Sequence, residues 1–179
     1  MDRHVKGTER FSTIEVVGAT IAHAEFIAPR MRDADVDECW ASSRLKPFDA
    51  LVLGMQSTRA CWTGLYKREP FCMFGVVRST SDKDVGIVWL LATDRINECS
   101  REFLRQNGYY VQAMRSQFKL LMNVVDDRNR QAKRWLEWLG FEMEEAMPYG
   151  PDKLPFRQFH MQGHLGYKVP HRPGAHNNV

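Results

Sequence analysis

The stretch from Asn129 to Phe141 constrains the fold more than any other part of the sequence. Its apolar residues recur at the spacing of one helix face, and charged residues occupy the opposite side. Asn129 can accept a hydrogen bond from the free amides of a first helical turn. Gly140 suits the left-handed residue that ends a helix, and Phe141 begins a period-two pattern typical of a strand. The sequence therefore predicts a helix that leads directly into a strand. The apolar face consists of Ala132, Trp135, Leu136 and Leu139.

The composition is that of one packed domain. The chain has 179 residues, of which 44% are apolar and 11% aromatic. It contains no apolar run of about 18 residues and no apolar signal core near Met1, so we expect neither a membrane span nor a secretory signal. The four cysteines lack the paired spacing of zinc ligands, and we expect reduced, mostly buried thiols without disulfides. They are Cys39, Cys61, Cys72 and Cys99.

The net charge of +3 is unevenly distributed. Residues 151–179 contain Lys153, Arg157, Lys168 and Arg172 against Asp152 alone, so the remaining residues sum to zero. A dedicated DNA-binding domain needs clustered cations, and this distribution disfavours one. Nucleic-acid contact through the basic end of the chain stays open, beside the alternative of a solvated extension. The usual nucleophile-elbow and phosphate-loop motifs of hydrolases and nucleotide triphosphatases are also absent from the sequence.

Hydrophobic periodicity predicts the order strand, helices, three strands, helix, strand, helix and two strands. The long helix after Thr93 is expected to be capped by Ser100, with Glu102 in its first turn. From Gly163 onward Gly, Pro, His and Asn dominate, which predicts no regular structure. The strands are expected at residues 13–19, 60–66, 71–78, 85–93, 120–125, 141–148 and 156–162, and the other helices at 22–31, 35–42, 48–59 and 129–139.

This order, together with Asn129-x-x-Ala132-x-x-x-Leu136-x-x-x-Gly140-Phe141, resembles the GNAT superfamily of N-acetyltransferases. The resemblance spans roughly residues 11–162. It implies an α/β fold (α+β mixed sheet) of about seven strands with helices on both faces, split at an acyl-coenzyme A site. We therefore expect a single GNAT-like domain over residues 1–162 and an extended C-terminal tail over residues 163–179.

A narrower resemblance concerns tailed phages. The run Val88-Trp89-Leu90-Leu91-Ala92-Thr93, the run Ser100 to Leu104 and residues 123–141 are similar to GNAT-like proteins encoded beside phage structural genes. Among these is the internal virion protein A family of short-tailed phages, the podoviruses. The resemblance implies a role in the virion or in virus assembly, through protein–protein interaction with portal, tail or internal proteins. It also implies an oligomeric state within a particle, and location in the virion after synthesis in the host cytoplasm.

Two positions depart from the catalytic members that the chain resembles. Those members follow the fourth strand with a glycine-rich loop whose backbone amides hold the coenzyme pyrophosphate. Here residues 94–100 contain no glycine, and Asp94 and Glu98 would repel the phosphates. Leu136 occupies the position of a tyrosine that protonates the leaving thiolate, and leucine has no proton to give.

The leading hypothesis is thus a degenerate GNAT-like fold used as a protein-binding module, with no cofactor and no assigned catalytic residue. The alternative is an active acetyl-CoA-dependent N-acetyltransferase. It would need another acid, for which Tyr109, Tyr110, Tyr149 and Cys99 are candidates, and a base, for which Glu15, Asp84 and Glu98 are candidates. If acetyl-CoA binds, the resemblance places it on Leu91, Ala92, Thr93, Ile96, Arg101 and Asn129.

Trp138 falls beside the apolar stripe of its helix, where it can belong either to an interface or to a partly buried helix edge. We expect contacts to other virion proteins at Trp138 and, in the tail, at Tyr167, His171 and Arg172. The spacing of His160 and His164 would suit a metal pair on a helix. Because residues 156–162 are expected to form a strand, we predict no metal site.

Overall fold

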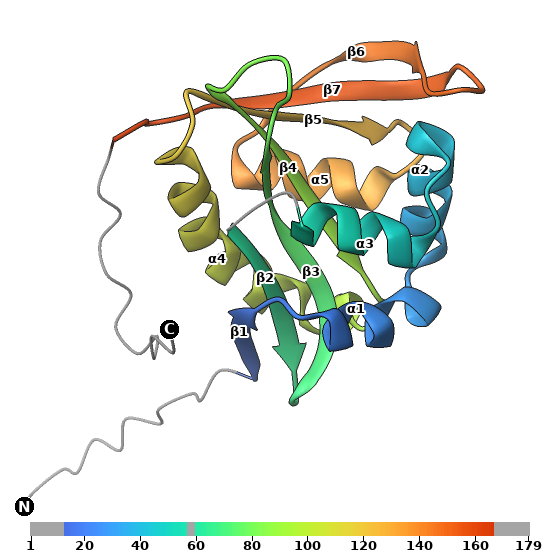
Figure 1. Cartoon of the computed structure of the whole chain (residues 1–179), viewed down its shortest axis with the longest axis vertical. Coiled ribbons are helices and arrows are strands. Elements are labelled where there is room, and N and C mark those ends of the chain that lie inside the picture. Colours follow the sequence, from blue (N-terminus) through green and yellow to red (C-terminus); the bar gives the residue numbers. More distant parts are fainter. Residues whose placement is uncertain (1–12, 57–59, 167–179) are drawn as a thin grey trace, which may run out of the picture.

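The computed structural model describes residues 13–56 and 60–166. A seven-stranded sheet in the order β1-β2-β3-β4-β5-β7-β6 forms its centre (Figure 1), and β4 with β5 is its one parallel pair among the described residues. The elements are β1 (Ile14–Gly18), α1 (Ile21–Ile27), the short 3₁₀ helix η1 (Ala28–Arg30), α2 (Asp33–Ser43), α3 (Pro47–Gln56), β2 (Ala60–Tyr66), β3 (Glu69–Arg78), β4 (Val85–Ala92), α4 (Ile96–Arg115), β5 (Leu120–Asp126), α5 (Arg130–Leu139), β6 (Glu142–Tyr149) and β7 (Leu154–Gln162).

The expected fold class and order of elements are confirmed. The start of the long helix was predicted wrongly, because α4 begins at Ile96 and contains Ser100 within it. The backbone explains the difference: the amide of Ile96 already donates to the Thr93 carbonyl at 3.1 Å, so the first turn closes without a side-chain cap. The predicted domain boundary at residue 162 stays a prediction.

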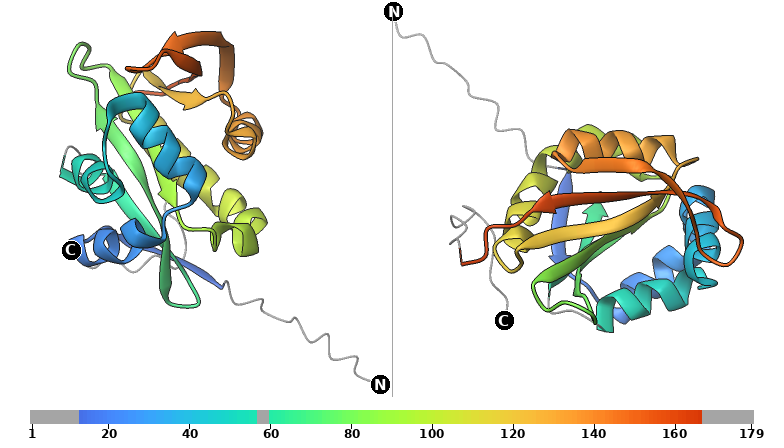
Figure 2. Two further views of the ribbon diagram at one scale, coloured as in Figure 1. Left: turned by 90° about the vertical axis from the view of Figure 1, so that its right-hand side faces the viewer. Right: turned by 90° about the horizontal axis from the view of Figure 1, so that it is seen from above.

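Helices cover both faces of the sheet (Figure 2). On one face, α1 and α3 pack on β3 through a cluster that includes Ala24, Ile27, Leu51 and Met73. On the other face, α4 and α5 lie over clusters that include Phe74, Val88, Phe103 and Val111. None of the described helices is long and apolar enough to cross a membrane.

The sheet is split between β4 and β5. Their parallel pairing covers only Val85–Ile87 with Leu120–Met122, after which no further register pair joins them. Beyond that point β5 pairs with β7 along its whole length, while β4 pairs with β3. Asn123 crosses the start of the gap, where its Nδ2 donates to the Val88 carbonyl at 2.8 Å. Two sheet halves, β1-β2-β3-β4 and β5-β7-β6, therefore meet at a short seam and separate beyond it.

The helix that the sequence predicted most specifically is α5. The Asn129 side chain accepts from the Ala132 amide at 3.2 Å, and Gly140 has the positive φ of 93° that a left-handed residue requires. Phe141 is buried and packs edge-on against Phe159. The apolar face of α5 points inward as expected, yet none of its side chains is fully buried.

Candidate functional site

A cavity of about 850 Å³ occupies the split in the sheet. Its walls come from both sides, because residues of α2 and α3 line one part and residues of α4 and α5 line the other. Leu90 of β4 and Val124 of β5 lie in central strands and are nevertheless only half-buried. The gap between the strands thus continues as a space through the sheet.

The carboxyl end of β4 is occupied by the start of α2. The Ala92 amide donates to Asp35 Oδ2 at 2.9 Å, and the Ala92 carbonyl accepts from the Arg32 amide at 2.9 Å. The next amide, that of Thr93, donates to Phe71 on the β3 side. Since peptide groups alternate along a strand, those of Ala92 face the gap toward β5. The Arg32 amide and the Asp35 carboxylate therefore take up the hydrogen bonds that the Ala92 peptide groups would otherwise leave free at this strand edge.

Arg32 extends this contact to the helices of the other face. Its guanidinium is buried, donates to Asp35 and to Gln131 Oε1 (2.9 Å for the latter), and lies 5.3 Å from the centre of the Trp135 ring. Gln131 Nε2 in turn donates to Asn97 Oδ1 at 2.6 Å. Burial raises the pKa of Asp35 even though Arg32 opposes the shift. A continuous polar network thus joins α2, α5 and α4 across the gap.

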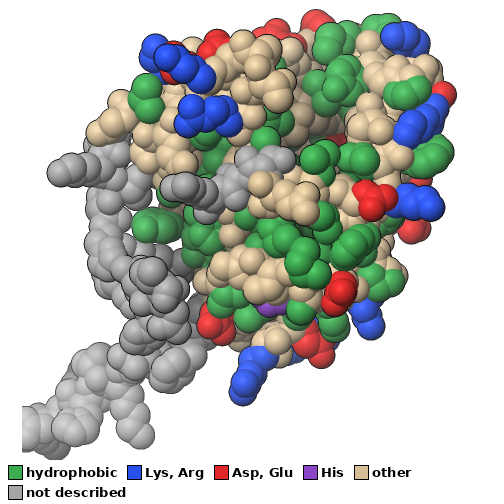
Figure 3. All heavy atoms as spheres, in the orientation of Figure 1, with side chains coloured by type: hydrophobic (Ala, Val, Ile, Leu, Met, Phe, Trp, Pro, Cys, Tyr) green, Lys and Arg blue, Asp and Glu red, His purple; other side chains and the backbone are tan. Residues whose placement is uncertain are grey.

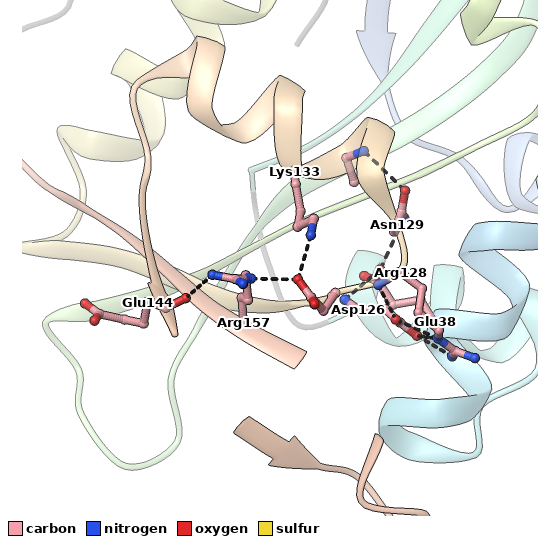
Figure 4. A network of polar contacts seen from close by, with 9 residues as sticks. Glu38, Asp126, Arg128, Asn129, Lys133, Glu144 and Arg157 are labelled. Carbon is pink, nitrogen blue, oxygen red and sulfur yellow. Dashed lines mark hydrogen bonds and ion pairs between the residues drawn. The ribbon is translucent and has the colours of Figure 1, made fainter. Parts of the chain in front are cut away.

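A second polar cluster lies at the end of β5 (Figure 4). Glu38 accepts hydrogen bonds from the Asp126 amide at 3.2 Å and from Asn129 Nδ2 at 3.3 Å. Burial, with smaller contributions from the nearby carboxylates of Asp35 and Asp126, raises the pKa of Glu38 to about 7. A carboxyl with this pKa can gain or lose a proton near neutral pH.

Ion pairs fix the backbone around this cluster. Asp127 Oδ1 accepts from Lys133 Nζ and from Arg157 Nε, each at 2.6 Å, and these two bonds lower the pKa of Asp127. Arg157 also donates to the Glu144 carbonyl at 3.2 Å (Figure 4). Asp126 is buried; its hydrogen bonds to Arg128 outweigh the effect of desolvation and lower its pKa.

The split mixed sheet with its two helix layers is matched by solved structures. A GCN5-related N-acetyltransferase from Kribbella flavida superimposes with a TM-score of 0.64, covering 84% of this chain and 98% of that chain at 16% identity. A GNAT superfamily phosphinothricin acetyltransferase from Sinorhizobium meliloti, solved in complex with AcCoA, gives 0.64, with 94% and 98% covered at 14% identity. An N-acetyltransferase from Staphylococcus aureus Mu50 gives 0.64, with 84% and 99% covered at 11% identity.

The chain has a GNAT-like fold. At these identities the similarity establishes the architecture and not the reaction. No protein-family profile and no curated protein sequence matches the chain.

The residues at the expected coenzyme groove of the GNAT fold do not fit a pyrophosphate. The first-turn amides of Ile96, Asn97 and Glu98 donate at 3.0 to 3.1 Å to the carbonyls three residues earlier, so they are already used within the turn. The gap-facing peptide groups of Ala92 are bonded to α2, as described above. Coenzyme phosphates would meet satisfied amides here, and the strand edge is closed by Arg32 and Asp35.

The structure distributes the six predicted coenzyme residues over several surroundings. Ala92, Thr93 and Ile96 lie together and buried at the end of β4. Asn129 lies on the opposite rim, where its side chain caps α5 and donates to Glu38. Leu91 packs with the cluster on the α1–α3 face, and Arg101 is exposed on α4.

The candidate acids and bases are mostly remote from the cavity. Tyr149 lines it at an exposed position, whereas Tyr110 belongs to an aromatic cluster with Trp62 and Phe74. The Cys99 thiol bonds to the Arg95 carbonyl, and desolvation raises its pKa to about 11. The candidates that do not line the cavity are Tyr109, Tyr110, Cys99, Glu15, Asp84 and Glu98.

Trp138 is 58% exposed on the outer side of α5. Tyr167, His171 and Arg172 lie outside the described residues. His160 lies on β7 with its ring nitrogens 3.5 Å from Glu142 and Glu144, whereas His164 contacts Arg115. The two histidines therefore have different partners, and no metal-binding group of His, Cys, Asp or Glu occurs among residues 13–56 and 60–166.

Sequence reasoning missed the residues that define the gap. Asp35 and Glu38 come from α2 and Arg32 directly precedes it, and Trp89 and Asn107 line the cavity from β4 and α4. In α2 the acidic residues are too numerous for the sequence to indicate which of them turns inward. Asn107 gave a weak signal, because it is a polar residue on the otherwise apolar buried stripe of α4. It lies four residues after Phe103 and four residues before Val111.

Proposed function

We propose that this protein is a catalytically reduced GNAT-fold protein that acts in a tailed-phage virion, or in its assembly, by binding other virion proteins. The loss of catalysis is supported by one observation above all, the closure of the gap-facing edge of β4 by Arg32 and Asp35. The virion role rests on the resemblance of residues 88–93, 100–104 and 123–141 to the internal virion protein A family.

Opening the groove for a coenzyme has a large energetic cost. Each broken hydrogen bond costs about 1 kcal/mol net, and a coenzyme on this edge would break the two bonds of Ala92. Separating the buried Arg32–Asp35 pair would leave uncompensated charge, which costs roughly 3–5 kcal/mol. Leu136 lines the cavity and offers no hydroxyl, so a bound thioester would also lack an acid at this position.

The protein-binding role would use the exposed face of α5. Trp138 and Arg134 lie four residues apart on this face, and both are exposed. Tryptophan and arginine are enriched among the residues that dominate binding energy at interfaces. We propose contacts to portal, tail or internal proteins through Trp138 and through Tyr167, His171 and Arg172, with several copies in each particle.

Calorimetry with acetyl-CoA tests the loss of catalysis. We expect no binding at about 1 mM acetyl-CoA. The binding free energy would then be weaker than the roughly 4 kcal/mol of a complex with a millimolar dissociation constant. A micromolar dissociation constant would refute this part.

Particle composition tests the virion role. We expect the protein in purified particles and expect Trp138→Ala to reduce its incorporation, with Ile21→Ala, which truncates an exposed residue 43% accessible, as the matched control. Absence from particles that assemble normally without the gene would refute the virion role.

A working N-acetyltransferase is the second candidate, favoured by the cavity and by Glu38. With a pKa of about 7, Glu38 is suited to accept a proton from an amine at the cavity wall, and Tyr149 at the mouth can donate one. Acetyl-CoA would then lie along Leu91, Ala92 and Thr93 after α2 moves. Acetylation of an amine at about 1 per second or faster would establish this activity and refute the loss of catalysis, while particle composition would still decide the virion role.

A further inference from the structure

The connection between β3 and β4 carries basic side chains that face solvent. Arg78 ends β3 and Lys83 lies in the connection; both are exposed, and neither has an ion-pair partner within the described part of the chain. Lys119 lies beside them, because its amide donates to the Asp84 carbonyl at 2.8 Å and its Nζ contacts Asp84 Oδ2 at 2.7 Å. Lys and Arg side chains accordingly gather at the upper left of Figure 3, over this connection.

A single carboxylate lies among these cations. The hydrogen bond from Lys119, together with the charges of Lys83 and Arg78, lowers the pKa of Asp84. The other acid of the connection is Asp82, and its Oδ1 accepts from the Asp84 amide at 2.9 Å, which fixes the turn. Two carboxylates therefore face three cations, and a local positive charge remains at an ordered turn.

The C-terminal end of β7 is fixed beside this turn. The Gly163 amide donates to the Lys119 carbonyl at 2.8 Å, and the His164 amide donates to the Arg115 carbonyl at 2.7 Å. The Arg115 guanidinium in turn donates to the Gln162 carbonyl at 2.8 Å. The chain therefore leaves the sheet next to Lys119, with a further cation holding it there.

Further basic residues follow in the sequence. Residues 167–179 contain Lys168 and Arg172 and no acidic side chain. We call the whole set the basic surface; it consists of Arg78, Lys83, Arg115, Lys119, Lys168 and Arg172, with Asp82 and Asp84 among them. The rest of the chain has 19 basic and 20 acidic side chains, since the whole chain has 25 and 22. The basic surface therefore carries the entire positive excess of the protein.

The acidic side chains of β6 lie to one side of the basic surface. Glu142 and Glu144 are exposed, but β7 separates their strand from β5. Adjacent strands are about 4.8 Å apart, so β6 lies about 10 Å from β5, which is close to the Debye length at physiological salt. A negatively charged partner that approaches over the β3–β4 connection thus meets mainly the cations.

The arrangement suits a chain of phosphates better than a single anion. The described cations lie on separate connections and at a helix end, and an exposed cation gains little from one isolated counter-charge. A polyanion instead releases condensed counterions at each contact, so separate exposed cations contribute together. Thr80 and Ser81 are exposed in the same connection, and hydroxyl groups of this kind commonly bond to phosphate oxygens.

We propose that the basic surface binds the phosphate backbone of a nucleic acid without regard to base sequence. Contacts to phosphates position a nucleic acid but carry no sequence information, which fits a surface made of lysine, arginine and hydroxyl groups. This binding requires neither the coenzyme nor the virion role.

Fluorescence anisotropy with a labelled DNA duplex of about 25 base pairs tests the proposal on the full chain, at salt concentrations from about 50 to 200 mM. We expect a micromolar dissociation constant at the lowest salt. Contacts from Arg78, Lys83, Lys168 and Arg172 would give a slope of about −3.6 for log affinity against log salt, which is a loss of about 100-fold over this range. No binding at the lowest salt, or a slope near zero, would overturn the proposal.

Poly-L-glutamate distinguishes a nucleic acid from an acidic protein. Its charges are about 3.3 Å apart along an extended chain, against about 1.7 Å along a duplex, so fewer counterions are released at each contact. We expect it to displace the labelled duplex at least about tenfold less effectively than unlabelled duplex at equal anion concentration. Equal displacement would favour an acidic protein as the partner and would overturn the proposal.

Paired substitutions locate the binding surface. Arg78→Ala with Lys83→Ala should weaken binding at least about tenfold and reduce the magnitude of the salt slope by about 2. Arg130→Ala with Arg134→Ala removes as many exposed charges from the outer face of α5 and should leave the affinity within about twofold. Equal weakening in both pairs would mean that net charge alone matters, and would overturn the proposal.

A third pair keeps the test independent of the β3–β4 connection. Lys168→Ala with Arg172→Ala changes residues outside the described elements and should also reduce the magnitude of the salt slope by about 2. An unchanged slope in this pair would overturn the proposal even if Arg78→Ala with Lys83→Ala does not fold.

Discussion

Glu38 is the residue whose chemistry depends most on its surroundings. Isolated glutamate is ionised at neutral pH, but here α2 turns the carboxyl toward the end of β5, where it loses water and faces Asp126. The folded protein therefore binds this proton more tightly than the unfolded chain does. By linkage, the stability contributed by this group is greatest below about pH 4.5 and falls as the pH rises toward about 7.

We predict that Glu38→Gln increases stability at pH 8. The change of pKa from 4.5 to about 7 corresponds to roughly 3 kcal/mol, which is the largest expected gain. The amide oxygen of glutamine can still accept from Asp126 and Asn129. Urea unfolding at pH 4 and pH 8 measures the effect, which should be near zero at pH 4. Glu98→Gln, at an exposed position of α4, is the control and should stay within about 0.5 kcal/mol at both pH values.

A second prediction concerns Leu136. Restoring a hydroxyl with Leu136→Tyr should not produce acetyltransferase activity, because the closed edge of β4 still excludes the coenzyme. Product formation from acetyl-CoA and an amine should equal that of the unchanged protein. A gain of about tenfold or more would show that the hydroxyl alone was limiting.

At the scale of elements, α5 shows what short-range signals determine. Its cap, its stop and its inward face depend on residues a few positions apart, so Asn129, Gly140 and Phe141 could be interpreted from sequence. The start of α4 could not be predicted, because backbone carbonyls of Thr93, Asp94 and Arg95 close its first turn. Every residue type has a backbone carbonyl, so no residue in the sequence indicates where this turn begins.

We predict that Asn129→Ala destabilises the protein by about 1–2 kcal/mol, since it removes the cap of α5 and one partner of Glu38. Ser100→Ala is the matched control, because Ser100 lies within α4 and caps nothing; its effect should be below about 0.5 kcal/mol. Thermal unfolding compares the two. Equal losses would mean that the cap contributes little.

The candidate site could be predicted far less well than the fold. The missing tyrosine at Leu136 and the glycine-free connection after β4 were visible in the sequence. The pairing of Arg32 with Gln131, 99 positions later, was not, because only the folded chain brings α2 beside α5. Long-range polar networks have no periodicity in sequence, so neither Arg32 nor Glu38 could be recognised as a site residue from the sequence alone.

At the scale of the molecule, α2 links the two sheet halves that the short β4–β5 seam leaves apart. Asp35 bonds to β4, Arg32 bonds to α5, and Glu38 bonds to the end of β5. Arg44 at the other end of α2 pairs with Asp152 in the β6–β7 hairpin at 2.5 Å. One helix thus contributes much of the contact between the halves.

We predict that Asp35→Ala destabilises the protein by roughly 3–5 kcal/mol, because Arg32 stays buried without its counter-charge. Amide exchange at Ala92 should accelerate in the same variant, since this amide loses its acceptor. Asp33→Ala, an exposed change in the first turn of α2, is the control and should cost at most about 1 kcal/mol. A similar loss of stability in Asp35→Ala and Asp33→Ala would argue that the Arg32–Asp35 pair does not join the two sheet halves.

The short seam also bears on the order in which the chain acquires its structure. β1, β2, β3 and β4 are sequential neighbours in one half, and β5, β6 and β7 form the other, so each half is built from contiguous chain. Low sequence separation between partners favours rapid pairing, which in this chain applies to the β2–β3, β3–β4 and β6–β7 hairpins. The three register pairs between Val85–Ile87 and Leu120–Met122 join residues 35 positions apart, so we expect them to form after these hairpins. Closing the seam would then be a late event in folding, when the cavity takes its final shape.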